Sequence, residues 1–340
     1  MKFLFTADIH LSRYAQDKID GGTNLPERLH SIKQTLTSMA EYACNNNVEF
    51  FIIGGDIMHS KSIIYSIAQE IMLDFFDAFN NQLQFVVLDG NHDLSGKGDQ
   101  AISSLRSIEY LQNMKWITKM PDTGPLMDIL CIPYSYNIVN QVKAKRSKIL
   151  ISHFGLNEGM LNSGISIQSD ISLNDLIGKY ELVLLGHYHK PQEIITDQIK
   201  LYYVGSPIQL DWGEKNDEKR FLVVDTDTMD VQSIPTQGYK KHIELEINST
   251  NRAEILVEAE QQKQSGNYVK LIKTDSVEIG TDEYSVIDKT EKDITNRGIT
   301  SAMSEKDRLK RFLEIKEISA DKTEQYLNAG IEIINSCEEE

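Results

Sequence analysis

An α/β fold built in layers is predicted by three features of the sequence. Short apolar segments alternate with longer amphipathic segments, as strands alternate with helices in α/β proteins. The apolar segments are uninterrupted runs of Phe, Ile, Leu and Val, which is typical of buried strands. Several of them end directly at Asp, Asn or His. The expected strands cover residues 3–5, 50–53, 85–88, 128–132, 149–152, 182–185, 201–204, 221–224 and 231–234.

Amphipathic helices are expected between several of these strands. The first, at residues 26–44, begins at Pro26, and proline is favoured in the first turn of a helix. The second, at residues 63–80, has an apolar stripe wider than one core face needs. That width favours either deep burial or a subunit contact at an exposed apolar position such as Met72. A further helix is expected at residues 101–112.

The pattern changes near residues 237–239. Residues 242–247 and 268–272 alternate like strands on either side of a charged amphipathic segment, which predicts a small separate α/β module. A polar linker at residues 288–300 follows this module. The helices expected in this part of the chain cover residues 252–264, 305–318 and 321–334.

Length and charge limit the possible classes of function. A chain of 340 residues is expected to form two or three domains. Lys and Arg total 35 against 51 Asp and Glu, which gives a net charge of −16. That balance disfavours broad, unaided binding to nucleic acid. A nucleic-acid substrate would require a local basic channel or metal ions that neutralise its phosphates.

Cysteine usage and hydropathy favour a cytoplasmic protein, in the host cytoplasm if a phage encodes it. Cys44, Cys131 and Cys337 lie far apart, and no Cys-x-x-Cys pair occurs. The sequence therefore predicts neither a zinc knuckle nor a disulfide framework. The apolar start of the chain is too short for a signal peptide. No segment approaches the ~20 apolar residues that a membrane span requires.

The most informative loop is Gly90-Asn91-His92-Asp93, which follows the expected strand at residues 85–88. Gly90 allows a sharp turn, after which an amide and an imidazole arrive together. Taken alone, the four residues are typical of an ordinary polar turn. They gain weight because four other expected strands also end at Asp or His.

The strand-end residues form a mixed oxygen and nitrogen donor set without a thiolate. Such a set suits Mn²⁺ or Fe²⁺ better than a structural Zn²⁺. Apart from His92, the strand-end residues supply seven candidate ligands, which are too many for one ion and suffice for two. Two ions roughly 3.5–4 Å apart can clamp a phosphate and activate a water. His92 would remain available for the leaving group. His30, His242 and the basic cluster at residues 143–148 are expected on the surface. The strand-end residues are Asp8, His10, Asp56, Asn91, His92, His153, His187 and His189.

In this order, the motifs resemble the calcineurin-like metallophosphoesterase superfamily. The matching motifs are Asp8-x-His10, Gly55-Asp56, Gly90-Asn91-His92-Asp93, His153 and Gly186-His187-x-His189. The resemblance implies two facing mixed β-sheets flanked by helices. It also implies one metal bound by Asp8, His10, Asp56 and His189, and a second bound by Asp56, Asn91, His153 and His187. Asp56 would bridge the two ions.

Two longer segments resemble the SbcD-type double-strand-break repair nucleases. Within that group, the pattern is most similar to the phage recombination endonuclease subunit. These segments are residues 186–192 and 203–214, and the resemblance covers residues 1–235. Departures from the pattern are Ser12 in place of a frequent glycine, a longer loop at residues 21–24, and Phe154 after His153.

The resemblance also implies a domain plan and partners. Residues 1–236 would form the nuclease domain, residues 240–290 a capping domain, and residues 301–340 a helical segment that docks on an SbcC-type coiled-coil ATPase. The expected assembly is a homodimer within a two-plus-two complex that acts on DNA in double-strand-break repair, recombination and recombination-dependent replication. The expected cofactors are two divalent ions, Mn²⁺ first and Mg²⁺ second, and the expected activity is that of an exonuclease or endonuclease.

Two other readings use the same residues. The first is a phosphodiesterase that acts on small molecules with the same two metals, and it would need neither C-terminal docking helices nor a dimer. The second is a scaffold subunit that keeps the fold without the chemistry. Loss of chemistry usually appears as missing ligands, and all seven are present here.

Overall fold

A computed structural model of the chain describes residues 1–14, 17–96, 98–123, 128–161, 168–280, 284–290, 303–316 and 318–338. These residues form two compact units. The first comprises residues 1–243 and 266–268, and the second comprises residues 244–265 and 269–340. Among the described residues, no helix has the length and apolarity needed to cross a membrane.

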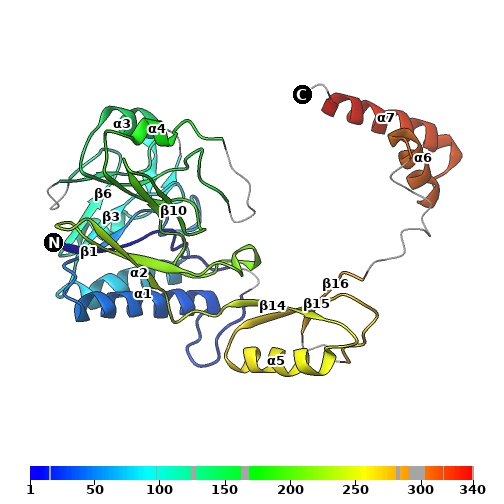
Figure 1. Cartoon of the computed structure of the whole chain (residues 1–340), viewed down its shortest axis with the longest axis horizontal. Coiled ribbons are helices and arrows are strands. Elements are labelled where there is room, and N and C mark those ends of the chain that lie inside the picture. The colour runs from blue at the N-terminus through cyan, green and yellow to red at the C-terminus, as the bar shows by residue number, and fades with distance from the viewer. Residues whose placement is uncertain are drawn as a thin grey trace. The chain divides into compact units, whose positions relative to one another are not determined.

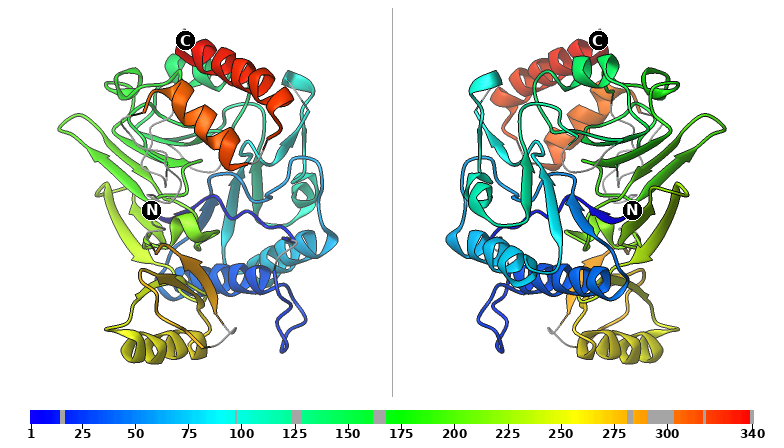
Figure 2. Two further views of the ribbon diagram at one scale, coloured as in Figure 1. Left: turned by 90° about the vertical axis from the view of Figure 1, so that its right-hand side faces the viewer. Right: turned by 90° about the vertical axis from the view of Figure 1, so that its left-hand side faces the viewer.

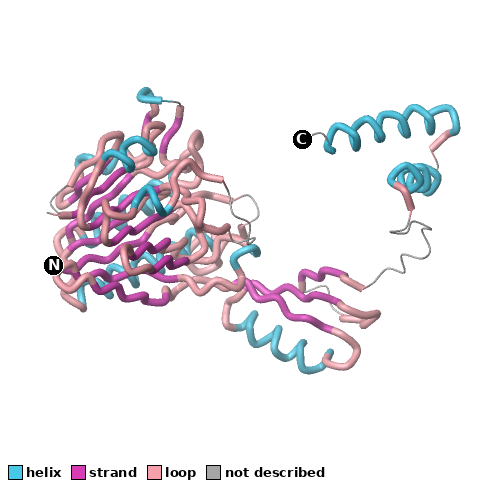
Figure 3. The backbone as a smooth tube through the Cα atoms, turned by 45° about the horizontal axis from the view of Figure 1, so that its top comes forward, coloured by secondary structure: helices cyan, strands magenta, loops and turns pink. Residues whose placement is uncertain are grey.

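Two mixed sheets form the centre of the first unit (Figure 3). The larger sheet has the strand order β13-β12-β1-β2-β3-β6, in which β1, β2, β3 and β6 run parallel and β12 and β13 run antiparallel to their neighbours. Its strands are β1 (Lys2–Thr6), β2 (Phe50–Ile53), β3 (Gln84–Leu88), β6 (Met114–Ile117), β12 (Arg220–Asp225) and β13 (Asp230–Pro235).

The second sheet has the strand order β10-β11-β9-β8-β7. Only its β10–β11 pair is antiparallel. Its strands are β7 (Ile129–Ile132), β8 (Ile149–His153), β9 (Leu182–Gly186), β10 (Gln192–Ile195) and β11 (Lys200–Tyr203). The mixed character expected of both sheets is thus confirmed.

Alternation along the strands builds the four layers. Side chains at odd and even positions of a strand point to opposite faces of the sheet. Phe3 and Phe5 of β1 therefore join Ile151 of β8 and Leu184 of β9 in a core between the two sheets. Leu4, between the two phenylalanines, belongs instead to a second core under the outer helices. Because both faces of these strands are covered, their sequences are apolar without interruption.

Helices cover the outer face of each sheet. The helices α1 (Glu27–Asn45) and α2 (Ser66–Phe79) pack on the six-stranded sheet, and α3 (Ile138–Ala144) and α4 (Leu173–Leu176) pack on the other sheet (Figure 1). Figure 2 shows α1 and α2 together along one side of this unit. The arrangement confirms the predicted fold of two facing mixed sheets flanked by helices.

Two details of the sequence prediction for this unit are wrong. Met72 is only 1% exposed and packs in the core under α2, so the wide apolar stripe reflects deep burial around this residue. The helix expected at residues 101–112 is replaced by a short strand, β5 (Ile102–Ser103), and a 3₁₀ helix (Arg106–Tyr110). Strand β5 pairs with β4 (Leu94–Ser95), and this hairpin interrupts the segment.

The second unit contains a small sheet with one helix. Its strand order is β14-β15-β16, with β14 (His242–Ile247), β15 (Tyr268–Lys273) and β16 (Ser285–Asp288), and its helix is α5 (Arg252–Gln264). Ile247, Ala259, Leu271 and Val277 form its buried core. Strand β16 pairs in parallel with β15, and all four of its residues are exposed.

The C-terminal helices α6 (Glu305–Ile315) and α7 (Ala320–Glu338) pack against each other. Leu309 lies against Gly330, where an added Cβ would meet its side chain at 2.5 Å. Leu313 is buried, whereas Phe312 and Tyr326 are 47% and 46% exposed. Helix α6 ends three residues before the expected Ile318. Most of the expected linker, residues 291–300, lies outside the described residues.

Candidate metal centre

The loops that follow five parallel strands bring the predicted site residues together at one edge of the sheets. Asp8 and His10 follow β1, Asp56 follows β2, and Asn91 follows β3. The remaining imidazoles come from the other sheet, where His153 ends β8 and His187 and His189 follow β9. In parallel sheets, ligands bind at this carboxyl edge of the strands.

Several of these residues hold unusual backbone angles. Asp8, His10, Asp56 and His187 have φ angles of 56°, 54°, 55° and 98°, in the left-handed region that non-glycine residues rarely adopt. Gly90 packs so closely on Asp56 that an added Cβ would lie 2.2 Å from its Oδ1. Strained residues of this kind cluster where a fold holds functional groups in position.

One group of donors converges near His10. The Nε2 atom of His10 lies 2.9 Å from Nε2 of His189 and 3.8 Å from Oδ2 of Asp56. Both oxygens of Asp8 lie 3.0 Å from the backbone N–H of His187, which donates to them. All these side chains except His189 are almost fully buried. The four residues are those that the family resemblance assigns to the first metal.

A second group shares Asp56 with the first. The Nε2 atom of His153 lies 3.2 Å from Oδ2 of Asp56 and 3.2 Å from Oδ1 of Asn91. That Asn91 oxygen also lies 3.0 Å from Nδ1 of His187. Asp56 therefore lies between the two groups, as a bridging carboxylate must. Among the described residues, clusters of potential metal ligands include Asp8 with His10 and His189, and Asp8 with Asp56 and His153.

Asp93 is a buried residue whose role the sequence did not reveal. Its carboxylate accepts hydrogen bonds from the backbone N–H groups of Asp56 at 2.8 Å, Met58 at 2.9 Å and Gly90 at 2.9 Å. It thereby ties the loop after β2 to the loop after β3. The motif Gly90-Asn91-His92-Asp93 marked this position, but only the fold shows that the Asp93 carboxylate binds backbone N–H groups.

His92 lies beside the donors, and its backbone contacts the Asp56 carboxylate. Its backbone N–H donates to Oδ1 of Asp56 at 2.7 Å, and its Nδ1 bonds the backbone carbonyl of His59. Because a carbonyl can only accept, Nδ1 of His92 carries a hydrogen and Nε2 is the nitrogen left to act elsewhere. The ring packs edge-on against His10, with 4.9 Å between centroids.

His59 is a second site residue that was not selected from the sequence. Its Nδ1 lies 3.4 Å from Nδ1 of His10, and its ring stacks on that of His92 at 5.7 Å. If Nε2 of His10 binds a cation, its Nδ1 must carry the hydrogen and donate to His59. His59 then has its own hydrogen on Nε2. The Asp56-Ile57-Met58-His59 segment contained the signal, since His59 lies three residues after a predicted ligand.

Burial and neighbouring charges set the protonation states of the cluster. Burial lowers the pKa of His10 well below its usual range, and it lowers the pKa of His187 to about 3. Burial also opposes charge on His153 and Asp56, but their mutual attraction is stronger. It raises the pKa of His153 to about 9 and lowers that of Asp56. Desolvation raises the pKa of Asp8.

These observations fit a pair of divalent cations. Imidazoles that are neutral, as the lowered pKa values of His10 and His187 favour, an amide oxygen and carboxylates are donor forms that bind such ions. The two facing nitrogens of His10 and His189 share one approach direction, which a common cation would satisfy. The second nitrogen of His153 lies 2.8 Å from the carbonyl of Gly54, to which it donates, so Nε2 faces the donors.

Other predicted surface features differ in outcome. His242 is wrong as a surface residue, because it is 6% exposed and its ring contacts Trp212 and Tyr268. His30 is partly exposed. The basic cluster is exposed as expected, and its Lys143 pairs with Asp175 at 3.4 Å.

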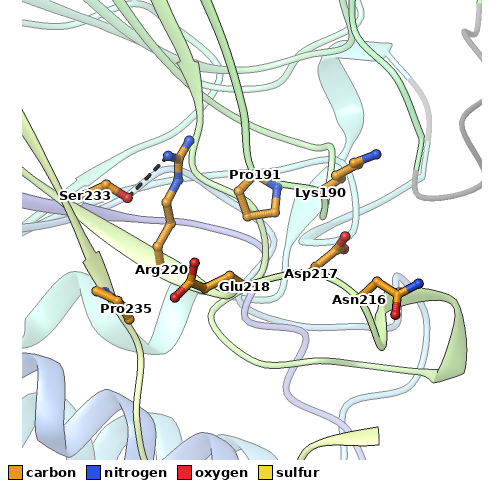
Figure 4. A pocket seen from close by; sticks show the side chains of 8 residues that line it. All are labelled: Lys190, Pro191, Asn216, Asp217, Glu218, Arg220, Ser233 and Pro235. Carbon is orange, nitrogen blue, oxygen red and sulfur yellow. Dashed lines mark hydrogen bonds between the residues drawn. The ribbon is translucent and has the colours of Figure 1, made fainter. Parts of the chain in front are cut away.

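A pocket of about 400 Å³ adjoins the loop that carries His189. Lys190, Pro191, Asp217, Glu218 and Arg220 are among the residues that line it (Figure 4). None of the eight lining residues belongs to the donor set, so this pocket is separate from the metal centre. It borders a buried network behind His189.

This chain is similar to known proteins over about two thirds of its length. The family model described as calcineurin-like phosphoesterase matches residues 1–191. Exonuclease subunit 1 of Enterobacteria phage T4 is 28% identical over 252 residues, which cover 69% of this chain and 68% of that protein. The DNA double-strand break repair protein Mre11 of Archaeoglobus fulgidus is 24% identical over 245 residues, covering 65% of this chain and 53% of that protein.

Among solved structures, an archaeal phosphodiesterase is similar at 15% identity and a TM-score of 0.35, over 69% of this chain and 99% of that one. The family match spans more than half of the chain and includes every predicted site residue from Asp8 to His189. The chain therefore belongs to the calcineurin-like phosphoesterases, a family of hydrolases that use divalent metal ions.

Proposed function

We propose that this protein is the nuclease subunit of a DNA-processing complex and hydrolyses phosphodiester bonds with two divalent ions. The convergence of seven oxygen and nitrogen donors at the ends of five strands carries this proposal. Mn²⁺ is the favoured ion, because the set contains four imidazoles, whereas Mg²⁺ prefers an all-oxygen octahedron. The relatives named as a phage exonuclease subunit and a double-strand break repair protein support DNA as the substrate.

The ligand roles follow the two groups of donors. Asp8, His10, Asp56 and His189 would hold one ion, and Asp56 would share the second ion with Asn91, His153 and His187. Bound there, the two ions would polarise the phosphate and activate the attacking water. The chain's own contribution is to fix these donors through strained loops and through the hydrogen bonds of Asp93 to the backbone.

His92 is the proposed general acid. Its Nδ1 is occupied by the carbonyl of His59, so Nε2 is the atom that would donate a proton to the leaving oxygen. The His59 ring stacks on the His92 ring. With a metal bound, His59 would accept a hydrogen bond from Nδ1 of His10. The hydrogen of the His59 ring would then lie on its Nε2.

The proposed domain plan assigns residues 1–236 to catalysis, residues 240–290 to a capping domain that shapes the DNA path, and residues 301–340 to docking on an SbcC-type ATPase. Exposed Phe312, Ile315 and Tyr326 on α6 and α7 give this last segment an apolar surface. Homodimer formation would use the segment before α2, where Ile63 and Tyr65 are 59% and 38% exposed. Such a complex would serve break repair, recombination and recombination-dependent replication.

Digestion of end-labelled linear duplex and single-stranded DNA tests the proposal. The purified chain should degrade DNA in Mn²⁺, degrade it more slowly in Mg²⁺, and lose activity in EDTA until Mn²⁺ is restored. A small chromogenic phosphodiester in parallel distinguishes a nuclease from a small-molecule phosphodiesterase. If the chain cleaves the small ester but neither DNA, whether or not the ATPase is present, the small-molecule phosphodiesterase is favoured. Full activity in EDTA after dialysis would exclude the two-metal mechanism.

A further inference from the structure

A buried group of charges lies directly behind the His189 ring, outside the matched family region. Oε1 of Glu214 lies 2.9 Å from Nδ1 of His189. Glu214 is only 2% exposed, although it lies on a short 3₁₀ helix (Trp212–Glu214). Its position places a carboxylate on the side of the ring opposite to the nitrogen that faces His10.

The other oxygen of Glu214 is held by three donors. Lys219 Nζ lies 2.7 Å from Oε2, the Ser206 hydroxyl donates to it at 3.0 Å, and the backbone N–H of Leu210 donates at 3.0 Å. The carboxylate therefore cannot rotate away from His189 without breaking several contacts. Buried charges are retained in proteins when they are paired and hydrogen-bonded in this way.

Lys219 also holds the backbone of His189. Its ammonium donates to the His189 carbonyl at 2.9 Å and to the Ser206 hydroxyl at 3.0 Å, and its side chain is fully buried. The same carbonyl accepts the backbone N–H of Ser206 at 3.1 Å. Gly205 permits this close approach, because an added Cβ would lie 2.7 Å from the His189 oxygen. Lys219 thus holds the backbone of His189 directly and its ring through Glu214.

The outer end of the network reaches the pocket of Figure 4. Asp217, which lines that pocket beside Lys190, pairs with Lys219 at 3.3 Å. Arg220, also in the pocket wall, pairs with Glu193 instead. Glu193 is therefore an ion-paired carboxylate in the same neighbourhood that contacts no proposed ligand, and it provides a matched control.

The two halves of the metal centre differ in this respect. His153, in the second half, directs its Nδ1 to the neutral backbone carbonyl of Gly54. His189 directs its Nδ1 to a carboxylate. A carboxylate partner fixes the hydrogen on Nδ1 and makes the other nitrogen a stronger ligand, and such partners typically contribute about 10–100-fold to metal affinity.

The geometry points to Glu214 and Lys219 as positioning residues for one metal of the pair: Glu214 orients and strengthens His189, and Lys219 holds both in place. This inference rests on the metal centre of the proposed function and adds an asymmetry to it. The ion bound by Asp8, His10, Asp56 and His189 depends on the network. The ion bound by Asp56, Asn91, His153 and His187 does not.

An EPR titration of free Mn²⁺ on the full-length chain tests the inference without DNA. The wild type should bind two ions. Glu214→Gln should bind one of them about 10–100-fold more weakly and leave the other unchanged. Glu193→Gln should match the wild type at both sites. If Glu214→Gln does not fold, the double variant Glu214→Gln with Lys219→Met removes both charges together, and the same selective loss is expected.

The outcomes separate this inference from the proposed function. Wild-type affinity at both sites in a folded variant overturns it, and so does an equal loss at both sites, which indicates a merely structural role. A wild-type chain that binds fewer than two ions overturns the inference together with the two-metal mechanism. A chain that shows the selective loss but does not cleave DNA supports the positioning role and overturns only the proposed substrate.

Discussion

The two compact units of this protein use their buried side chains differently. In the first unit, three apolar clusters fill the space between and outside the sheets, and the loops at the strand ends carry buried charges. In the second unit, the α/β module has a small core around Leu271, and the C-terminal helices expose Phe312 and Tyr326. The first unit therefore holds strained, buried charges of the kind that a metal centre needs, whereas the second unit leaves aromatic side chains exposed.

The largest effect is expected at Asp56, the proposed bridging carboxylate in the first unit. Asp56→Asn should lower Mn²⁺-dependent cleavage by about 10³-fold or more, since the metals supply several kcal/mol to the transition state. The variant should also bind less Mn²⁺ in equilibrium dialysis. Asp288→Asn on exposed β16 of the second unit is the control and should cleave normally. Wild-type rates in Asp56→Asn would remove Asp56 from the bridge.

A smaller effect is expected when the proposed general acid is removed and both metal ions stay bound. His92→Ala should keep both ions and DNA binding while losing about 10²–10⁴-fold in cleavage, the usual contribution of a general acid. Metal analysis of the purified variant, beside single-turnover rates, makes the distinction. A variant that loses an ion would identify His92 as a ligand instead.

Variants at Met72 and Ile63 test the difference between a buried and an exposed apolar side chain. Met72→Glu would place a charge in a tightly packed core and should lower the free energy of unfolding by about 4 kcal/mol or more. Ile63→Glu lies on an exposed position and should leave thermal unfolding unchanged while weakening self-association in sedimentation. Equal stability of the two variants would contradict the buried position of Met72.

Much of the first unit could be predicted because its strands are covered on both faces. The unbroken apolar run of β3 and the polar residues after it follow directly from that environment, and so does the meeting of Asp8, Asp56 and His153. Two edge strands, β6 and β10, were missed for the converse reason. Strand β10 alternates between half-buried and exposed residues, and the half-buried β6 has no continuous apolar run.

The contacts that the sequence did not reveal depend on distant partners. Glu214 reaches His189 across 25 positions, and nothing near it in the sequence indicates burial. The buried ring of His242 packs against Trp212 and Tyr268, which come from separate segments. Periodicity describes which face of an element is covered, but it cannot identify a partner that arrives from another element.

The smallest change in basal activity is expected from deletion of residues 301–340. These residues carry none of the proposed ligands, so Mn²⁺-dependent cleavage by the truncated chain should stay close to the wild-type rate. Stimulation by the ATPase should disappear, because short amphipathic helices of this kind bind partners through an exposed apolar face. Unchanged co-purification of the truncated chain with the ATPase would place the docking surface elsewhere.

A pair of point variants makes the same test without deleting a segment. Phe312→Ala removes an exposed aromatic side chain, so the α6–α7 pair should keep its helicity, whereas Leu313→Ala removes a buried side chain of α6. Loss of a central aromatic anchor typically costs about 2 kcal/mol or more in binding, or roughly 30-fold. If docking uses the exposed face, Phe312→Ala should weaken the ATPase complex by that factor in a titration while its circular dichroism matches the wild type. Leu313→Ala should lower both helicity and affinity. A Phe312→Ala chain that binds as the wild type does would show that this face is not the contact.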